Sequence, residues 1–412
     1  MPAYERISIT DYLLGSVQYS SGCPYRCEFC DIPELYGKKA RMKRPGQLLA
    51  ELDSMLAGGN PGAVYFVDDN FIANPRAATA LLEALISWQR ERGYPLEFAC
   101  EATLNVTGRP KILELMRQAR VTTMFCGIET PEPEALRRMG KTQNLRSPIL
   151  DAVETLNSYG IEVVSGIILG LDTDTLETYE RVLSFIEESA IPMCTVNLLQ
   201  ALPRTPLYRR LEAAGRLLPE GGAGTNVKFL LPEETVLAGW HAVLSAAFSP
   251  EALYHRYAKQ MSTTYRARMP VPITPARVAP ALLARGSVML MRVLWHVGVR
   301  ADYRRYFWQL ARPALRRGQI QEVIQVATVA HHLIEFAREA LRGSAERSFY
   351  APAGRSTSVT PVSPREQSHA SAQAQSLWRG RTPSCLSVRA WRQGPTSWLT
   401  ERVSNIGSKS RR

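Results

Sequence analysis

The sequence predicts an α/β fold built on a parallel sheet, and three observations support this prediction. Short apolar runs alternate with amphipathic helical patterns from Ser16 to about Leu199. These runs are continuous rather than alternating, which is typical of strands buried on both faces. Six of them are separated by helical stretches, so successive strands should run parallel. The pattern fits an open doubly wound sheet and a barrel equally well.

The six expected strands cover residues 15–20, 63–68, 96–101, 123–129, 162–170 and 194–200. The helices between them are expected at 45–58, 75–92, 109–119 and 176–189, where apolar residues recur at three- and four-residue spacing. Proline stands near three of these helix starts, where its missing N–H group is tolerated.

The chain beyond the sixth strand changes character twice. Residues 205–260 predict helices and a loop at 220–229, and residues 275–341 read as all-helical. From Gly343 onward the chain is rich in Ser, Arg, Gln and Pro, which predicts a disordered basic tail; a shifted reading frame is the alternative. We therefore expect three units: a barrel core at 1–215, a helical region at 216–342 and the tail at 343–412.

Composition and charge narrow the function classes. About 45% of the 412 residues are hydrophobic, enough for a substantial core. The tail holds eleven basic and three acidic residues, so it carries +8 of the net +12 and leaves +4 for residues 1–342. This small positive charge argues against nucleic-acid binding by residues 1–342. No secretory signal opens the chain, so we expect a cytoplasmic protein.

Three of the seven cysteines, Cys23, Cys27 and Cys30, lie within "CPYRCEFC", directly after the first strand. Three thiolates from one loop can each bind one iron of a cubane cluster and leave the fourth iron open. A structural zinc site would need a fourth ligand, and no nearby Cys or His supplies it. The aromatic residues of the motif, Tyr25 and Phe29, are candidates for cofactor contact. Three other cysteines, at 100, 126 and 194, are expected in the core.

The motif resembles the C-x3-C-x-aromatic-C signature of radical S-adenosylmethionine (SAM) enzymes. This resemblance implies a partial (β/α)6 barrel in which the open iron of a [4Fe–4S] cluster binds SAM. The reduced cluster then cleaves SAM and produces a 5′-deoxyadenosyl radical. "VYFVDDNFIAN", "FCGIETPEPEAL", "GIILGLDTDT" and "LLQALPRTPLYRRLEAAGRLL" extend the similarity to the cobalamin-dependent subgroup that includes hopanoid C-2 methylases.

The resemblance assigns SAM contacts to residues at the carboxyl ends of the strands. They are Asp68 and Asp69 after the second strand, Glu101 and Glu129 at the ends of the third and fourth, and Gly166, Ile168 and Gly170 on the fifth. Carboxylates can accept hydrogen bonds from ribose hydroxyls or an ammonium group. A bare backbone and an apolar side chain suit the adenine. For an acidic residue the ordinary alternative is a solvated surface charge.

As to function, the resemblance implies C-methylation of an apolar, hopanoid-like substrate, with flavodoxin or ferredoxin as electron donor. Subgroup members carry an N-terminal cobalamin-binding domain, and no Asp-x-His-x-x-Gly motif is found here. Cobalamin is therefore expected from another domain or a partner. One alternative is a cobalamin-independent radical SAM enzyme; another is an inactive iron–sulfur remnant.

Apolar residues interleave with arginines within 275–341, which is typical of a peripheral membrane surface and suggests that this region helps to admit an apolar, membrane-derived substrate. The alternative is that these helices only pack on the barrel and the arginines form a solvated rim. The run 286–299 is too short to span a bilayer and contains Arg292 and His296.

Overall fold

The computed structural model describes residues 2–9, 12, 14–218, 225–271 and 280–342, and its centre is one sheet of six strands. The strands are β1 (Gly15–Val17), β4 (Ala63–Phe66), β5 (Glu97–Glu101), β6 (Val121–Glu129), β7 (Glu162–Leu169) and β8 (Met193–Leu198). Their order in the sheet follows the chain, and every neighbouring pair is parallel. The predicted α/β fold with six parallel strands is confirmed.

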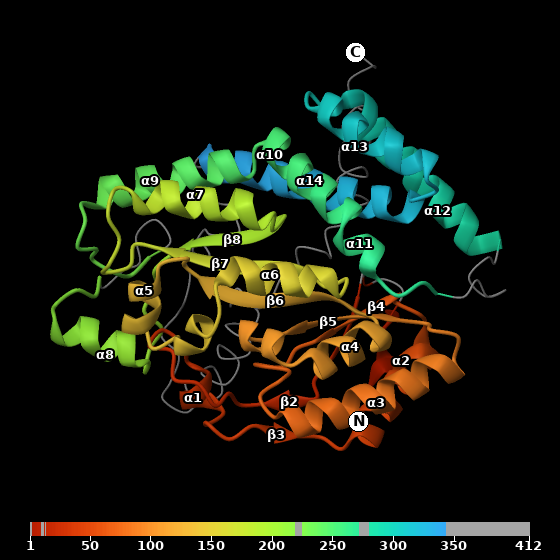
Figure 1. The fold of residues 1–412 in the computed structure, drawn as a ribbon, viewed down its shortest axis with the longest axis horizontal. Coiled ribbons are helices and arrows are strands. Elements are labelled where there is room, and N and C mark those ends of the chain that lie inside the picture. Colours follow the sequence, from red (N-terminus) through yellow and green to blue (C-terminus); the bar gives the residue numbers. More distant parts are fainter. Residues whose placement is uncertain (1, 10–11, 13, 219–224, 272–279, 343–412) are drawn as a thin grey trace, which may run out of the picture.

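Helices fill the connections between strands and surround the sheet (Figure 1). They are α2 (Pro45–Gly58), α3 (Pro75–Glu91), α4 (Pro110–Ala119), α5 (Pro133–Arg138), α6 (Ile149–Ser158) and α7 (Thr178–Ser189). The first three begin at a proline, as the sequence predicted. Short 3-10 turns η1 (Tyr4–Arg6), η3 (Leu104–Gly108) and η4 (Thr142–Leu145) complete this half.

A small hairpin after β1 was not predicted. The first expected strand ran to residue 20, but β1 ends at Val17 and a second strand, β2 (Ser20–Ser21), pairs antiparallel with β3 (Arg41–Met42). Helix α1 (Ile32–Leu35) lies between them in the chain. The hairpin closes the segment that contains the three clustered cysteines.

The C-terminal helices pack in three groups, one of which is a small cluster at α8. They are α8 (Pro206–Ala213), α9 (Glu233–Ala247), α10 (Pro250–Ser262), α11 (Thr264–Ala267), α12 (Pro280–Val293), the π-helix η6 (Leu294–Arg300), α13 (Arg304–Arg316) and α14 (Ile320–Leu341). Helix α9 joins the main core, and Trp240 Nε1 donates to Val196 O of β8 at 2.9 Å. Residues of α10, η6, α13 and α14 build a second core of their own.

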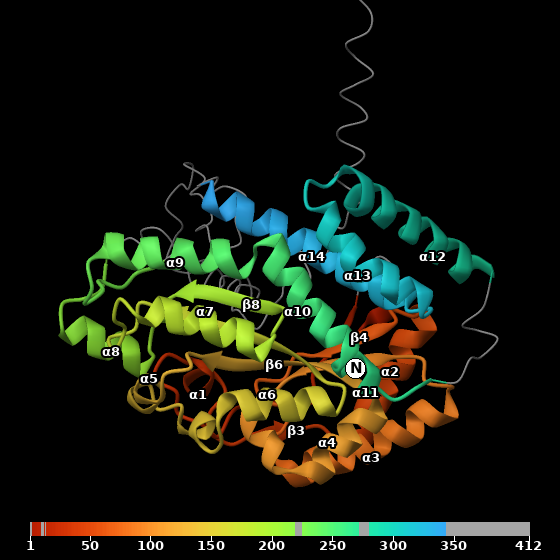
Figure 2. The same cartoon turned by 45° about the horizontal axis from the view of Figure 1, so that its top comes forward.

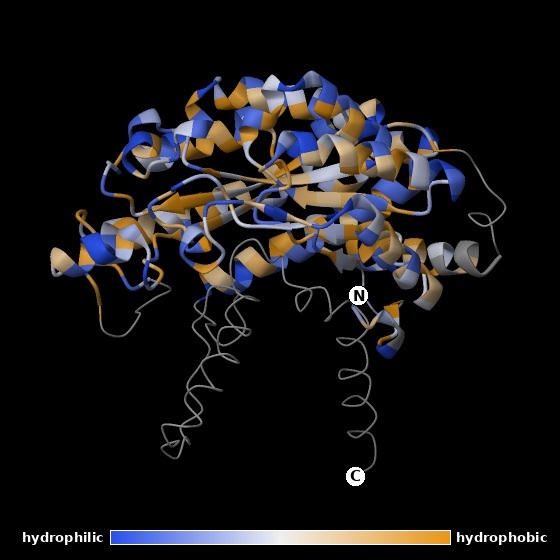
Figure 3. Ribbon diagram, turned by 90° about the horizontal axis from the view of Figure 1, so that it is seen from below, coloured by the Kyte–Doolittle hydropathy of each residue, from blue (hydrophilic) through white to orange (hydrophobic). Residues whose placement is uncertain are grey.

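Hydropathy follows these layers: the strands are mostly apolar, and the helices alternate apolar and polar bands (Figure 3). None of the helices in the described ranges combines the length and apolar character needed to cross a bilayer. The predicted disordered tail, 343–412, residues 220–224 of the predicted loop and residues 275–279 of the predicted helical region lie outside the residues that the structure describes.

Candidate active site

The loop with the three clustered cysteines leaves the sheet after β1 and is fixed from two sides. Glu28 N donates to Met139 O at 2.8 Å, and Leu207 N donates to Glu28 O at 3.0 Å. Cys27 is buried, and none of the three cysteines forms a disulfide. Segments from three distant parts of the chain therefore define the shape of this loop.

The surroundings of the cysteines favour a bound cation. Burial raises the pKa of the Cys30 thiol to about 12 and also raises the pKa of Cys23. Thiolates at such positions need positive charge nearby, which iron ions supply. No three His, Cys, Asp or Glu side chains of the described residues are grouped to hold a single metal ion. In a cubane cluster, by contrast, each cysteine binds a different iron.

Two amide side chains point N–H groups at the sulfur atoms. Gln143 Nε2 lies 3.5 Å from Cys27 Sγ, and Asn70 Nδ2 lies 4.0 Å from Cys23 Sγ. Both amides are buried. Hydrogen bonds of this kind stabilise negative charge on cysteine sulfur. Sequence reasoning missed both residues, although Asn70 directly follows the two aspartates it singled out.

A buried ion pair stands beside this loop. Lys141 Nζ lies 2.6 Å from Glu129 Oε1, and the two side chains are 7% and 10% exposed. Burial alone would lower the pKa of Lys141, but Glu129 and the charge of Cys27 raise it above its usual value. The ammonium also lies 5.4 Å from the centre of the Phe29 ring. A fixed positive charge therefore lies next to the cysteines, and no pattern in the sequence marked Lys141.

The end of β6 is shaped around this pair. Glu129 adopts a left-handed backbone with φ of 67°, which is uncommon for a residue with a side chain. A Cβ atom on Gly127 would lie 2.3 Å from Glu129 Oε1 and 2.7 Å from Lys141 Nζ. A side chain at this position would therefore displace the pair.

The two aspartates after β4 both hold the start of the cysteine loop. Asp68 is buried and accepts hydrogen bonds from Tyr19 N, Ser20 N and Ser20 Oγ at 2.6–2.8 Å. Asp69 accepts one from Gly22 N at 2.7 Å. Burial raises the pKa of Asp68 to about 6 despite these donors. The oxygens of Asp68 are thus occupied by the protein's own backbone and hydroxyl groups.

Glu101, at the end of β5, lies close to these aspartates. Burial raises its pKa well above the usual value, the hydrogen bond from Tyr65 OH at 3.1 Å opposes this, and the nearby charges of Asp69 and Asp68 raise it further. The structure therefore gathers the acidic side chains of Glu101, Asp68 and Asp69 at one place.

The aromatic residues of the motif have separate surroundings. Tyr25 reaches the segment after β5, where Asn105 Nδ2 donates to its hydroxyl at 2.6 Å. Phe29 packs against two small apolar clusters, one around Leu136 and one around Leu207. Phe29 thus connects the cysteine loop to α5 and α8.

The three candidates on and after β7 divide into two groups. A Cβ atom on Gly166 would lie 3.6 Å from Glu129 Oε2, so this glycine borders the buried ion pair. Ile168 instead packs with the cluster around Leu207, and a Cβ on Gly170 would lie 2.4 Å from the Phe229 ring. Packing against the C-terminal segment therefore explains Ile168 and Gly170 without a ligand.

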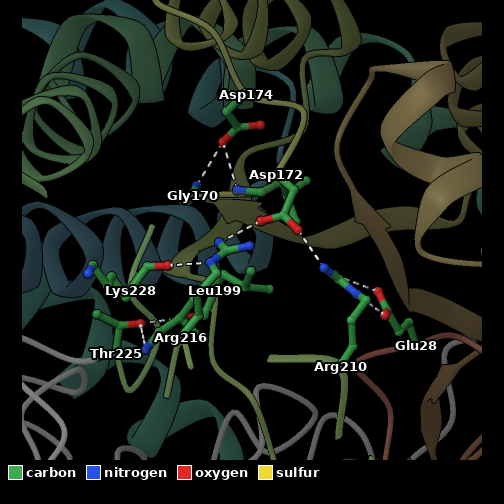
Figure 4. Close-up of polar contacts among 11 residues, drawn as sticks. Glu28, Gly170, Asp172, Asp174, Leu199, Arg210, Arg216, Thr225 and Lys228 are labelled. Atoms are coloured by element: carbon green, nitrogen blue, oxygen red, sulfur yellow. Dashed lines mark hydrogen bonds and ion pairs between the residues drawn. The ribbon is translucent and has the colours of Figure 1, made fainter. Parts of the chain in front are cut away.

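An alternating chain of charges ties the cysteine loop to α8 and to the loop after β7 (Figure 4). Arg210 lies 2.5 Å from Glu28 and 2.6 Å from Asp172, and Arg216 lies 2.7 Å from the other oxygen of Asp172. Burial opposes ionisation of Asp172, but Arg216 and Arg210 outweigh it and lower its pKa. We refer to Glu28, Arg210, Asp172 and Arg216 as the rim network.

The loop after β7 is also closed on itself. Asp174 accepts hydrogen bonds from Gly170 N at 2.7 Å and Leu171 N at 3.0 Å (Figure 4). Burial raises the pKa of Asp174 to about 6. These hydrogen bonds hold the loop in one shape, and the loop in turn holds Asp172 of the rim network in position.

Comparison with known families identifies the chain. The model of the radical SAM superfamily matches residues 17–186, and a domain of unknown function, DUF4070, matches residues 205–346. The chain belongs to the radical SAM superfamily. Membership implies a [4Fe–4S] cluster and SAM as cofactors, as expected from the cysteine motif.

Two curated proteins resemble this radical SAM protein over most of its length. It is 54% identical over 351 residues to the hopanoid C-2 methylase of Rhodopseudomonas palustris, an alignment that covers 85% of the chain and 66% of that relative. It is 34% identical over 353 residues to an uncharacterized methyltransferase of Synechocystis, covering 83% of the chain and 64% of the relative. The chain thus spans about two thirds of the length of each of these relatives.

Among solved structures, the radical SAM methyltransferase TsrM of Kitasatospora setae, with cobalamin and a [4Fe–4S] cluster bound, has a TM-score of 0.47 and 16% identity. The comparison covers 77% of this chain and 61% of that one.

The radical SAM site retains buried polar atoms that suit a bound ligand. Gln143 Oε1, Asn144 Oδ1 and Thr195 Oγ1 are buried and have no hydrogen-bond partner within the described part of the chain. Buried polar atoms are normally paired, so unpaired ones mark places where a ligand or water completes the bonding. Thr195 and Glu129 both border Gly166, in the middle of β7. These atoms fit a ligand that carries hydroxyl and amino donors, as SAM does.

Proposed function

We propose that this protein is a radical SAM C-methyltransferase acting on an apolar polycyclic lipid of the hopanoid class. The observation that supports this most strongly is the 54% identity to a hopanoid C-2 methylase over 351 residues. The Synechocystis relative, also named a methyltransferase, supports the same reaction class. The cysteine loop and the buried polar groups beside it supply the chemistry that this reaction needs.

In this proposal Cys23, Cys27 and Cys30 hold three irons of the cluster. When bound and reduced, the cluster supplies the electron that cleaves SAM and so releases a 5′-deoxyadenosyl radical. The chain's own residues act on the charge that reduction adds. Gln143 donates a hydrogen bond to Cys27 sulfur, and Lys141 places a positive charge nearby. Both stabilise the reduced state relative to the oxidised one.

The SAM contacts are distributed over the carboxyl ends of three strands. Asp69 and Glu101 lie in the acidic group that would attract the ammonium of SAM, and Glu129 borders Gly166, where its second oxygen is available to a hydroxyl. Asp68 acts through the loop instead, because its oxygens hold Tyr19 and Ser20.

The methyl group would come from methylcobalamin supplied by another domain or a partner. The electron would come from a small acidic carrier, flavodoxin or ferredoxin. An exposed basic stretch supports such an approach, because Lys38, Lys39 and Arg41 follow the cysteine loop closely. A Cβ on Gly22 would lie 3.0 Å from Lys39 O, so this stretch lies against the residue that precedes Cys23.

The test is anaerobic reconstitution of the full chain with iron and sulfide, followed by reduction in the presence of SAM. We expect a [4Fe–4S] spectrum and formation of 5′-deoxyadenosine. Cys27→Ala should lose both, whereas Cys194→Ala, in the buried core, should keep both. Retention of a full cluster in Cys27→Ala would refute the ligand assignment.

Cobalamin and substrate separate the remaining possibilities. Methylation of a hopanoid only when methylcobalamin is added would support the proposal. Turnover of another small molecule without any cobalamin binding would favour a cobalamin-independent enzyme. A stable cluster without any SAM cleavage would favour an inactive iron–sulfur protein.

A further inference from the structure

One helical face outside the barrel exposes an unusual set of apolar side chains. Val288, Met291, Trp295 and Val299, on α12 and η6, are 44%, 61%, 56% and 52% exposed. Spacings of three and four residues place them along one side of the helix. Exposed apolar residues are ordinary when scattered, but a contiguous group marks an interaction site.

The opposite side of the same helix is firmly packed. Val293 and Val297 are buried in the second core, and Trp308 Nε1 donates to Gly298 O at 2.8 Å. A Cβ on Gly298 would lie 3.1 Å from both the Phe307 and Trp308 rings, so η6 lies directly against α13. The helix is thus apolar on two sides, and only one of them is covered within the described residues.

Charge within α12, η6 and α13 is strongly one-sided. Residues 280–318 contain eight arginines and a single acidic residue, Asp302, whereas the first 342 residues as a whole carry only +4. The ion pairs found among the described residues involve none of the seven arginines at 292, 300, 304, 305, 312, 316 and 317. The one acidic residue is already paired with Arg338.

We infer that this α12–η6–α13 surface, which we call the hairpin face, binds an anionic membrane. Exposed Trp, Met and Val side chains suit the boundary between headgroups and acyl chains, and arginines suit anionic headgroups. A second copy of the chain is the less favourable occupant, because a symmetric contact would bring two sets of arginines together. The inference rests on the proposed function only in that a lipid substrate gives membrane contact a purpose.

The hairpin face is a tether rather than an entrance to the site. Figures 1 and 2 both place α12 and α13 at the end of the molecule away from α1, α5 and α8, which surround the cysteine loop. The sequence suggested that this region helps to admit the substrate. The arrangement instead favours a role in holding the protein at the surface where the lipid resides.

The test is co-sedimentation of the full chain with vesicles of phosphatidylglycerol and phosphatidylcholine, compared with phosphatidylcholine alone. We expect binding to the anionic vesicles at low salt that weakens as salt is added. Met291→Ser/Trp295→Ser and Arg300→Gln/Arg304→Gln/Arg305→Gln should each lower the partition coefficient about tenfold, which is about 1.4 kcal/mol.

Matched controls remove the same chemistry from the other end of the molecule. They are Leu176→Ser/Leu230→Ser, which are 67% and 64% exposed, and Arg137→Gln/Arg138→Gln/Arg209→Gln. These should leave vesicle binding unchanged. Circular dichroism melting of every variant confirms that the fold is retained.

Three results would overturn the inference. These are absence of binding to anionic vesicles at low salt, equal losses in the control variants, and a self-association that Met291→Ser/Trp295→Ser abolishes while vesicle binding persists. Dithionite-driven SAM cleavage should be unaffected in the variants of the α12–η6–α13 surface. Failure of SAM cleavage in the unaltered protein would refute the proposed function alone, since vesicle binding does not require it.

Discussion

The rim around the cysteine loop and the hairpin face treat charge in opposite ways. At the rim, Lys141 pairs with Glu129, and Arg210 joins Glu28 to Asp172. On the hairpin face, seven arginines take part in none of the ion pairs of the described residues. Both regions are rich in charged side chains. Those around the cysteine loop form ion pairs with one another, whereas the seven arginines form none with the described residues.

This difference separates charges that form ion pairs within the fold from charges that form none among the described residues. A buried pair is costly to break, because the remaining ion is left without water or counter-charge. An exposed arginine is solvated and contributes little to folding. Stability measurements should therefore respond to the rim and not to the hairpin face, whereas surface binding should show the reverse.

The largest effect is expected for Lys141→Met. The substitution leaves Glu129 buried without its partner, and we expect the free energy of unfolding to fall by about 3–5 kcal/mol. Urea denaturation of the full chain measures this. Lys141→Met/Glu129→Gln removes both charges and should recover most of the loss; a double variant as unstable as the single one would contradict the assignment.

A smaller effect is expected for Arg210→Met. This side chain is 45% exposed, so solvent screens its two ion pairs, and we expect a loss of about 1 kcal/mol. The neighbouring Arg209→Met is the control, because Arg209 lies 3.8 Å from Glu34 and is 57% exposed. It should change stability by less than about 0.5 kcal/mol. Equal losses in both variants would show that the rim network has no special role.

The buried carboxyl of Asp68 predicts a pH dependence. Its folded-state pKa, about 6, lies above the ordinary value of 3.8, so the folded state binds the proton more tightly than the unfolded state. The contribution of Asp68 to stability therefore rises as pH falls from about 6 to about 4, and is lost as pH rises through 6. Comparing the protein with Asp68→Asn by thermal melting isolates this group; a constant difference between pH 4 and 7 would contradict it.

The smallest effect is expected on the hairpin face. Arg304→Gln/Arg316→Gln/Arg317→Gln removes three charges that form none of the ion pairs seen among the described residues, so unfolding should change by less than about 0.5 kcal/mol. Urea denaturation at low and at moderate salt checks this. A loss of unfolding free energy above about 1 kcal/mol would mean that these arginines stabilise the fold, rather than serving only to bind a membrane surface.

The sequence predicted the strands, the helices and the cysteine loop, because these features depend on periodicity and on residues close together in the chain. All six strands appear, and the helix expected at 45–58 is α2 with the same bounds. The cysteine motif placed its loop after β1, because ligand spacing and a strand end are both local features. Features that depend on nearby residues therefore appear in the structure close to where the sequence pattern predicts them.

What the sequence did not predict are contacts between distant segments. Gln143 meets Cys27 across 116 positions, and Lys141 stands in a connection between α5 and α6 that carries no strand end to mark it. Asp68 and Asp69 look equivalent in the sequence, yet one is buried against Tyr19 and Ser20 and the other is half-buried beside Gly22. Such differences arise only when the hairpin β2–β3 folds over them.

The double attachment of Glu28 has a consequence for the order of events during biosynthesis. The residue sits between two cysteines near the start of the chain, but its backbone and carboxylate are held by Leu207 and Arg210, the latter 182 positions away. The loop therefore cannot reach its final shape until the ribosome has released α8. We expect chains ended at residue 200 to load iron poorly and chains ended at residue 342 to load it well. Iron content after reconstitution of both would decide the point.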